Sequence, residues 1–361
     1  MVPLSISPAP GPARLVVIVL RGAMDGLAAC APYADPNFAA LSRPGRPGPG
    51  GYVDLDGFFS LHPSLARLMP LWQKGDLAVV HAVATPYRDQ RSHFDGQDFL
   101  EFGKSSVPKG ASRSGWLNRL LGELPHARRE TGCAVGSDQL AILSGAVDVH
   151  RWSPDGTPGV SAEFQNLCLR AAESDTEIAT ALSAAFAVQG AARDTGAASE
   201  DRAAAYAANR LNDDARIAAF SIDGWDTHNF QHGTFTRAMD KLAGAIFTLH
   251  SIMSDTSWSH TTIIAMTEFG RTVRFNGTEG TDHGTGSAML VAGGAINGGR
   301  VYGDWPGLAE SDLYDRRDLL PTRDLRSHVG WVLRGQFGLQ RHTIEKTIFP
   351  GLEMGDDPGL I

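Results

Sequence analysis

Short apolar runs rich in Val and Ile recur along the chain and predict the strands of a sheet. Most of them are apolar throughout and do not alternate with polar residues. This pattern is typical of strands that are covered on both faces, and it therefore predicts a mainly parallel sheet. The predicted strands span 14–22, 76–84, 139–145, 216–224, 261–270 and 287–294.

Between these strands, apolar residues recur every three or four positions, which predicts amphipathic helices. The predicted helices span 62–75, 115–124, 233–253 and 323–339, and the Ala-rich stretch 161–210 is expected to contain two or three more. Strands that alternate with helices predict an α/β fold, with a doubly wound, mainly parallel sheet and helices on both faces.

The chain has 361 residues, enough for one large domain or two smaller ones. We expect an N-terminal extension over 1–13, followed by a single domain over 14–361 with a helical insertion at about 150–212. The opening "MVPLSISPAPGPAR" lacks the basic start and apolar stretch of a secretion signal. The expected location is periplasmic or secreted if a signal has been removed, and cytoplasmic if the chain is complete as written.

Composition narrows the classes of partner. The net charge is −8, from 32 basic and 40 acidic residues, which disfavours a nucleic-acid-binding protein. No apolar run approaches the roughly 18 residues of a membrane span. The three cysteines include no CxxC pair, which argues against a disulfide framework or a Cys-ligated zinc site. The sequence leaves the oligomeric state open.

Carboxylates and histidines gather where the predicted strands end. Ligands of an open parallel sheet bind beyond the carboxyl ends of its strands, so these positions are candidates for a site. Imidazole and carboxylate groups together suit zinc, manganese or iron, and all-oxygen sets suit calcium or magnesium. The candidate metal ligands are Asp25, Asp226, His228, Glu268, Asp282 and His283.

Several of these residues also have structural interpretations that the sequence leaves open. Asp25 suits a turn between Met24 and Gly26, and Glu268 suits an ion pair with Arg271. Asp226 and His228 lie on one side of an extended segment because side chains alternate along it. That spacing alone is a weak indication of a metal site.

The segment "RSHFDGQDF" carries a second type of chemistry. Ser92 stands where a helix begins, with Asp95 three residues later as a reciprocal cap. A hydroxyl at this position also suits a nucleophile, because a helix N-terminus favours an anionic phosphoryl or sulfuryl group. His93 is open to three roles: an orienter of Ser92, a metal ligand, or a phosphate donor.

Seven motifs occur in order over roughly 14–340: "LRGAMDGL", "LHPSLARLMPLW", "LAVVHAVATPYRDQRSHFDGQDFLE", "GWDTH", "TEFGRT", "DHGTGSAMLVAGGAINGGRVYG" and "DLRSHVGWVLRGQFGL". Together they resemble a bacterial family catalogued as domain of unknown function 1501. That family is similar in turn to the alkaline phosphatase superfamily, which includes sulfatases and cofactor-independent phosphoglycerate mutases. The resemblance implies an alkaline-phosphatase-like fold.

The superfamily resemblance also implies roles for single residues. Asp25 resembles the first carboxylate ligand, Ser92 the nucleophile and His283 the last histidine ligand. Asp226 and His228 resemble the ligand pair at one strand end. The superfamily usually has Asp-x-x-x-His there, and position 230 of this chain is Phe, so the resemblance implies that His228 or His232 substitutes. Glu268 takes the place of an Asp ligand, and the histidine expected after it is Phe269.

We therefore expect a metal-dependent hydrolase that acts on a small anionic ester of phosphate or sulfate. Ser92 would attack, with His93 beside it, and Arg91 or Arg271 would hold the ester oxygens. The expected cofactor is one or two divalent ions of zinc, manganese or calcium. The alternative, favoured by Phe269, is a non-catalytic protein that binds a metal or a partner. A nucleotide-cofactor enzyme is disfavoured because "GGAINGG" does not form a GxGxxG turn.

Overall fold

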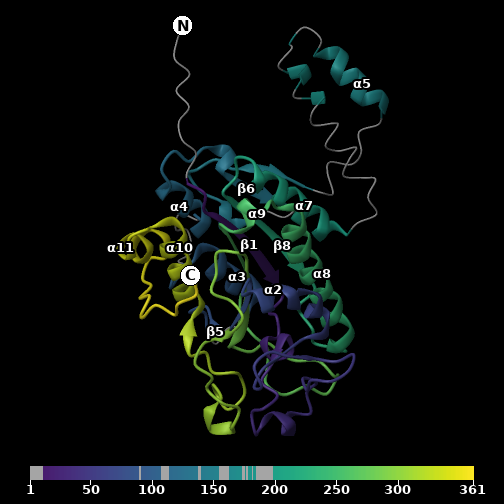
Figure 1. The fold of residues 1–361 in the computed structure, drawn as a ribbon, viewed down its shortest axis with the longest axis vertical. Coiled ribbons are helices and arrows are strands. Elements are labelled where there is room, and N and C mark those ends of the chain that lie inside the picture. The colour runs from purple at the N-terminus through teal and green to yellow at the C-terminus, as the bar shows by residue number, and fades with distance from the viewer. Residues whose placement is uncertain are drawn as a thin grey trace.

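The computed structural model describes residues 11–88, 91–106, 114–136, 140–153, 162–172, 175, 178–180, 182–183 and 198–361. Within these residues, a central nine-stranded sheet has helices on both faces (Figure 1). Its strands are β1 (Arg14–Arg21), β5 (Leu77–Ala84), β6 (Gly132–Val135), β7 (His150–Trp152), β8 (Ile217–Asp223), β9 (Thr261–Thr267), β10 (Ser287–Ala292), β11 (Val301–Tyr302) and β12 (Arg323–Asp324).

The strand order is β11-β5-β10-β9-β1-β8-β6-β7, with β12 also paired to β5. All neighbouring pairs are parallel except those of β10, which is antiparallel to both β5 and β9. The prediction of a mainly parallel, doubly wound sheet is confirmed. Because β10 runs in reverse, its N-terminal end meets the C-terminal ends of its neighbours at one edge of the sheet.

The helices and 3-10 turns occupy the connections between these strands. They are α1 (Gly26–Ala29), η1 (Phe38–Leu41), η2 (Pro63–Leu68), α2 (Met69–Lys74), α3 (His93–Phe102), α4 (Trp116–Glu123), η3 (Arg129–Thr131), η4 (Ala141–Leu143), α5 (Ala162–Ala171), α7 (Ser199–Asn212), α8 (Gln231–Ile252), α9 (Asp255–Trp258), η5 (Glu310–Asp312), α10 (Leu325–Phe337), α11 (Arg341–Thr343) and the π-helical turn η6 (Ile344–Ile348). A small antiparallel sheet contains β2 (Cys30–Ala31), β3 (Val53–Asp54) and β4 (Ser60–Leu61).

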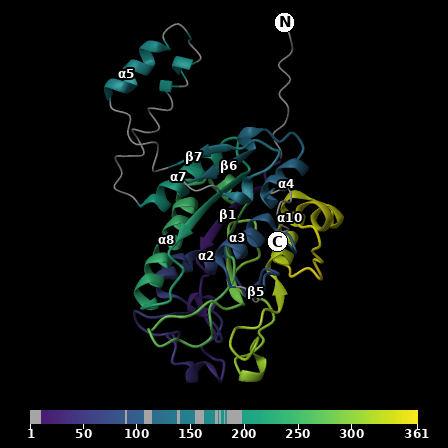
Figure 2. The same cartoon turned by 180° about the vertical axis from the view of Figure 1, so that it is seen from behind.

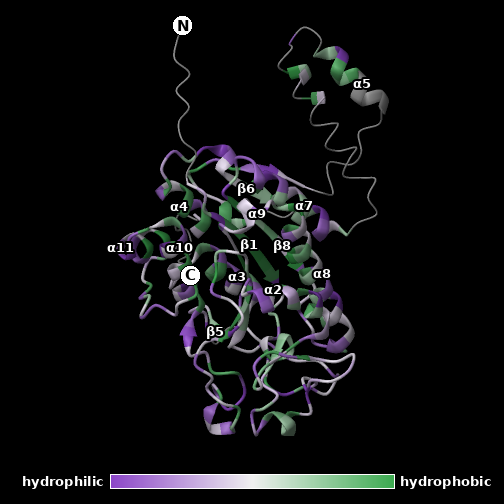
Figure 3. Cartoon of the chain, in the orientation of Figure 1, coloured by the Kyte–Doolittle hydropathy of each residue, from purple (hydrophilic) through white to green (hydrophobic). Residues whose placement is uncertain are grey.

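The central strand β1 shows why the apolar runs are continuous. Alternate side chains of β1 enter two different cores, so neither face has room for polar residues. Val16, Ile18 and Leu20 pack in the core that holds the buried side chains of α7 and α8. Leu15 and Val17 pack in the opposite core, with the buried residues of α4 and α10. Figure 3 shows β1 and β8 as hydrophobic strands at the centre of the molecule.

One predicted strand is wrong. The described part of segment 139–145 includes the 3-10 turn η4, and the strands in this part of the chain are β6 before it and β7 after it. Ile142 and Leu143 are buried as expected, but they pack in the α4 core from a turn. The Ile142 N–H donates to Glu101 Oε2 at 2.9 Å and therefore needs no partner strand. A short apolar run does not distinguish these two ways of burial.

The described parts of 150–212 fall into two groups. Strand β7 joins the edge of the sheet and α7 packs against α8, so both belong to the main body. Helix α5 stands apart from the sheet in both views (Figures 1 and 2). Much of the predicted insertion, and residues 1–10 of the predicted extension, lie outside the described residues. No helix in the described part of the chain has the length and apolarity to cross a bilayer.

Candidate metal centre

Four segments meet at the edge of the sheet where β10 begins. The loop after β8 carries Asp226 and His228, and α3 begins with His93 in the segment that follows β5. The segment before β10 carries His283, whose backbone forms an antiparallel bridge with Arg271 from the loop after β9. The reversed direction of β10 is thus what brings His283 to the ends of the parallel strands.

Asp226 lies at the centre of three histidines. Its Oδ1 atom is 3.0 Å from His228 Nε2 and 3.2 Å from His283 Nε2, and its Oδ2 atom is 3.4 Å from His93 Nε2. Potential ligand atoms of His93, Asp226 and His283 all lie within 4.8 Å of one another. The Asp226 side chain is 45% exposed, so the cluster is accessible to a small molecule from solvent.

The Nδ1 atom of each histidine is held by a different acceptor. His93 Nδ1 lies 2.7 Å from Glu268 Oε1, and His228 Nδ1 lies 3.3 Å from Asp282 Oδ1. His283 Nδ1 lies 2.7 Å from the carbonyl oxygen of Arg91. Because these oxygens accept, a neutral ring that donates from Nδ1 has its lone pair on Nε2, the atom that faces Asp226. A histidine whose Nδ1 donates to an oxygen while Nε2 faces the site is typical of metal centres.

Ring nitrogens in the cluster lie close together or lack a hydrogen-bond partner. His228 Nε2 and His283 Nε2 are 3.0 Å apart, and two lone pairs at this distance repel unless a cation or a proton lies near them. Among the residues that the structure describes, buried His93 Nε2 has no hydrogen-bond partner. His93, Asp226 and His283 therefore fit a divalent cation, with His228 beside them.

Electrostatic interactions in the cluster shift two pKa values. The carboxylates of Asp226 and Glu268 raise the pKa of His93 to about 9. Burial opposes ionisation of Asp226, but its contacts with His283, His93 and Arg271 outweigh this effect and hold its pKa well below the usual range. In the absence of a metal, His93 is therefore a cation at neutral pH. A metal that binds to His93 Nε2 displaces that proton.

Glu268 and Asp282 lie behind the histidines, although both were predicted as ligands. Glu268 is fully buried, and its Oε1 atom also accepts the N–H groups of Gly22 and Ala23 at 2.9 and 3.2 Å. Asp282 Oδ1 accepts from Asn276 Nδ2 at 3.2 Å as well as facing His228. Each of these two carboxylates contacts the Nδ1 atom of one histidine, Glu268 that of His93 and Asp282 that of His228.

The two arginines of the predicted site have different surroundings. Arg271 is buried, its Nη1 atom donates to Asp226 Oδ1 at 2.8 Å, and its Nε atom donates to Thr281 Oγ1 at 3.0 Å. It therefore holds Asp226 from behind and does not face a substrate. The Arg91 side chain is 36% exposed, and its Nη2 atom is 3.5 Å from Asp318 Oδ2. Arg91 is thus the arginine that remains accessible.

Asp25 lies outside the cluster and has a structural role here. Its Oδ1 atom caps α1 by accepting the N–H groups of Leu27 and Ala28. Its Oδ2 atom pairs with buried Arg43 and accepts from Gln231 Nε2 at 2.6 Å. Both oxygens are occupied, in agreement with the structural interpretation of this residue.

Ser92 and Phe269 lie directly beside the histidines. Ser92 caps α3, with its Oγ atom 3.5 Å from the N–H of Asp95, and the next residue is His93. Phe269 is buried and stacks on the His93 ring with 5.2 Å between centroids. Phe269 therefore presents an apolar ring and no ligand atom to the cluster. Among the described residues, the ligand atoms form one group, which suits one ion.

Comparisons with known proteins add a family assignment. The family model described as "Protein of unknown function (DUF1501)" matches residues 77–348, about three quarters of the chain. No curated protein matches the chain significantly.

Solved structures with similarity to the chain include a protein of the alkaline phosphatase superfamily, an alkaline phosphatase and a sulfatase. A protein of the alkaline phosphatase superfamily from Vibrio parahaemolyticus has 12% identity and a TM-score of 0.35, over 81% of this chain and 64% of that one. The chain thus spans less than two thirds of the length of this relative. A variant of TAB5 alkaline phosphatase with bound Mg has 10% identity and a TM-score of 0.33, over 80% and 92% of the two chains. A 2-O GAG sulfatase has 8% identity and a TM-score of 0.31, over 80% and 65%.

The TM-scores of these three structures are all below 0.5. The family model covers far more than half of the sequence and includes every segment that forms the metal centre. The chain belongs to the DUF1501 family of proteins of unknown function.

Proposed function

We propose that this protein is a metal-dependent hydrolase of phosphate or sulfate esters. The observation that carries the proposal is the arrangement of His93, His228 and His283 around Asp226, with each Nδ1 atom held and each Nε2 atom directed inward. Such a centre lies at the carboxyl edge of a parallel sheet, where enzymes of this architecture bind their substrates.

The donor set favours zinc or manganese over calcium. Calcium prefers six to eight oxygen ligands, whereas this cluster offers imidazole nitrogens and one carboxylate. A divalent cation held by these residues would supply a Lewis acid, which would polarise an ester oxygen and lower the pKa of a nearby hydroxyl. The buried contacts of Arg271 and Glu268 keep Asp226 and His93 in place while the cation is bound.

The N-terminus of α3 provides the other part of the proposed site. Ser92 and His93 are consecutive, so the Ser92 hydroxyl is held next to a proposed ligand, at the positive end of a ten-residue helix. The helix dipole favours an anionic ester at this position and favours ionisation of a nucleophilic hydroxyl. Partly exposed Arg91 precedes Ser92 and supplies the cation that contacts an equatorial oxygen.

The alternative is a metal-binding protein without turnover, and two observations favour it. Ser92 Oγ is already used as a helix cap, and Phe269 presents an apolar ring and no ligand atom to the cluster. Both functions require the metal, so only an activity measurement separates them.

The test is hydrolysis of 4-nitrophenyl phosphate and 4-nitrophenyl sulfate by protein that is purified without chelators. We expect turnover of one ester that a chelator abolishes and that zinc or manganese restores. The His283→Ala variant should lose this turnover, whereas His342→Ala, at an exposed position outside the centre, should keep it. Chelator-resistant turnover, or metal-loaded protein that hydrolyses neither ester, would contradict the proposal.

A further inference from the structure

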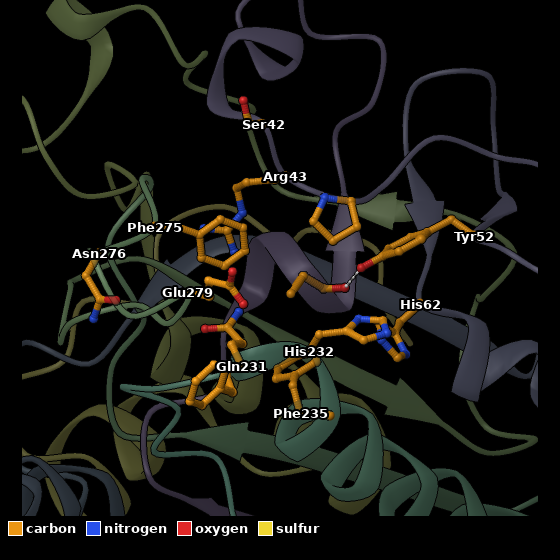
Figure 4. A pocket seen from close by; sticks show the side chains of 14 residues that line it. Ser42, Arg43, Tyr52, His62, Gln231, His232, Phe235, Phe275, Asn276 and Glu279 are labelled. Carbon is orange, nitrogen blue, oxygen red and sulfur yellow. Dashed lines mark hydrogen bonds between the residues drawn. The ribbon is translucent and has the colours of Figure 1, made fainter.

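A cavity of about 510 Å³ lies at the start of α8. Figure 4 shows Tyr52, His62 and His232 on one side of this cavity and Phe275 and Glu279 on the other. In another protein, an engineered apolar cavity of about 150 Å³ binds benzene. The cavity described here therefore has room for a flat molecule of two fused rings.

The cavity is separate from the metal centre. His93, Asp226 and His283 do not line it. His232, to which the superfamily resemblance gave a possible ligand role, lines the cavity and lies outside the group of ligand atoms found among the described residues. A molecule in the cavity therefore needs no contact with a metal ion.

The amide and hydroxyl groups in the buried part of the lining already have partners within the protein. Tyr52 Oη donates to the carbonyl oxygen of Ala28 at 2.9 Å, the contact that Figure 4 marks with a dashed line. Gln231 Nε2 donates to Asp25 Oδ2 at 2.6 Å, and Gln231 Oε1 accepts the hydroxyl of Thr281 at 2.5 Å. These groups are therefore not available to a polar ligand.

The charges of the lining disfavour an anion. The guanidinium of Arg43 is buried and paired with Asp25, and it also donates to two backbone carbonyl oxygens. Its charge is therefore already balanced by a carboxylate. Exposed Glu279 adds a negative charge at the cavity.

His62 keeps a hydrogen-bond donor for a ligand. Its ring is held edge-to-face by Tyr52 and by Phe235, with 5.4 Å between centroids in each pair. His62 Nδ1 accepts the N–H of Ser64 at 3.2 Å, so the neutral ring has its proton on Nε2. Burial, together with nearby His232, lowers the pKa of His62 to about 4, and the ring is therefore uncharged at neutral pH. In the part of the chain that the structure describes, Nε2 has no hydrogen-bond partner.

The remaining lining is rich in aromatic side chains, which favour stacked or edge-to-face contacts with another ring. Phe230, Phe235, Phe275 and Tyr52 all contribute to it. Phe230 is 72% exposed and has a left-handed backbone with φ of 43°, so its ring lies at the cavity and not inside the core. The lining as a whole therefore suits an apolar ring system with one polar substituent.

We propose that this cavity is a second binding site, which takes a flat, uncharged aromatic molecule with a hydrogen-bond acceptor. The rings of the ligand lie against the phenylalanines, and its acceptor receives the proton of His62 Nε2. The proposal goes beyond the proposed function, because binding here requires neither a metal nor hydrolysis.

The test is ligand-detected NMR on the full chain, treated with a chelator, with three naphthalenes that differ in charge. 2-Naphthamide is neutral and carries a carbonyl acceptor, 2-naphthoate is an anion, and 2-naphthylmethylamine is a cation at neutral pH. We expect the amide to bind at least about tenfold more tightly than either ion, because an ion loses its hydration without gaining a buried partner of opposite charge.

Three variants locate the ligand. Gly233→Leu fills the cavity from a position where an added Cβ meets no atom closer than 3.9 Å, and Phe230→Ala removes an exposed ring. Each should weaken binding of 2-naphthamide by about three- to tenfold or more. His62→Phe keeps an aromatic ring but removes the donor, so it should weaken 2-naphthamide by about three- to tenfold and leave 2-methylnaphthalene unchanged. Phe247→Ala is the matched control, since Phe247 is a partly exposed phenylalanine of α8 outside the cavity.

Circular dichroism verifies that each variant is folded, and the exposed position of Phe230 keeps the test informative if Gly233→Leu is not. Wild-type protein that does not bind 2-naphthamide, or equal binding in wild type, Gly233→Leu and Phe230→Ala, would overturn the proposal. So would 2-naphthoate that binds as tightly as the amide, or binding that the chelator abolishes, which would place the molecule at the metal centre. A failure to hydrolyse either nitrophenyl ester contradicts the proposed function alone.

Discussion

The three histidines of the centre differ in what holds them, and this difference predicts how each variant behaves. His93 and His228 are held by the side chains of Glu268 and Asp282, but His283 is held by the backbone carbonyl of Arg91. Substitution of Glu268 or Asp282 removes the group that holds His93 or His228. The support of His283 depends on the backbone conformation of Arg91, which has a left-handed φ of 50°.

The first prediction concerns the proton of His93 in metal-free protein. With its pKa raised from 6.5 to about 9, His93 stabilises the fold fully below pH 6.5 and loses this contribution as the pH rises through about 9. Glu268→Gln removes the charge that faces Nδ1, so the pKa of His93 should fall and the free energy of unfolding should decrease by about 1.5–3 kcal/mol. NMR titration of His93 measures the pKa, and urea unfolding measures the stability.

Glu123→Gln is the control for this prediction, because Glu123 is an exposed carboxylate at the end of α4. It should leave both measurements unchanged. A His93 that titrates near 6.5 in the metal-free wild type would show that Glu268 and Asp226 do not act on it as described.

At the scale of elements, close contact between two strand ends positions Asp226. Gly22 follows β1 with φ of 119°, and a Cβ at this position would lie 2.6 Å from the Asp226 backbone nitrogen. Gly22→Ala should therefore displace the Asp226 loop, lower the free energy of unfolding by more than about 2 kcal/mol and weaken metal binding. Urea unfolding and zinc titration measure the two effects.

Gly136→Ala is the control that separates the effect of backbone strain from the effect of the contact with Asp226. Gly136 has a similar φ of 127°, but no atom lies within 4 Å of its added Cβ. This variant should show a smaller loss of stability and unchanged zinc affinity. If both variants bind zinc equally well, the approach of β1 to the Asp226 loop is not what positions the ligand.

Helix α3 gives a prediction that separates the two roles of Ser92. Ser92→Ala removes the cap and should cost about 1 kcal/mol of stability, whereas Ser92→Asn keeps a side chain that caps equally well. If Ser92 is also the nucleophile, both variants lose turnover, and only Ser92→Ala loses stability. Turnover by Ser92→Asn at the wild-type rate would leave Ser92 as a cap alone.

At the scale of the whole molecule, most of the sheet could be predicted because its strands are apolar on both faces. β1, β5, β8, β9 and β10 fall within two or three residues of their predicted ranges at each end. The sequence offered no signal for the direction of β10. A short apolar run is compatible with either direction, and long-range pairing decides between them.

The candidate site was predictable as a set of residue types, but not as a set of roles. Strand ends identified Asp226, His228 and His283, because ligands of an open parallel sheet bind beyond the carboxyl ends of its strands. The roles of Glu268 and Asp282 depend on which atoms they face, and residue type does not show this. For His93 the sequence left three roles open: an orienter of Ser92, a metal ligand, or a phosphate donor. Its position directly after the helix cap Ser92 is the sequence feature that indicates where it lies in the centre.

Metal binding should stabilise the whole fold, because its ligands come from three separate segments. A ligand at a concentration 100 times its Kd stabilises a protein by about 2.7 kcal/mol, provided that it binds only the folded state. Removal of the metal by a chelator should therefore lower Tm by a few degrees, and zinc or manganese should restore it. The His283→Ala variant should have a Tm that chelation does not change.

The most direct test of the account is the metal content of the protein, purified without chelators and measured by mass spectrometry. The account predicts about one equivalent of a divalent transition metal per chain in the wild type. It predicts a large loss in His283→Ala and Asp226→Asn, and no loss in His342→Ala. A wild-type protein that neither contains nor takes up such a metal, or a metal content that is equal in all four proteins, would contradict it.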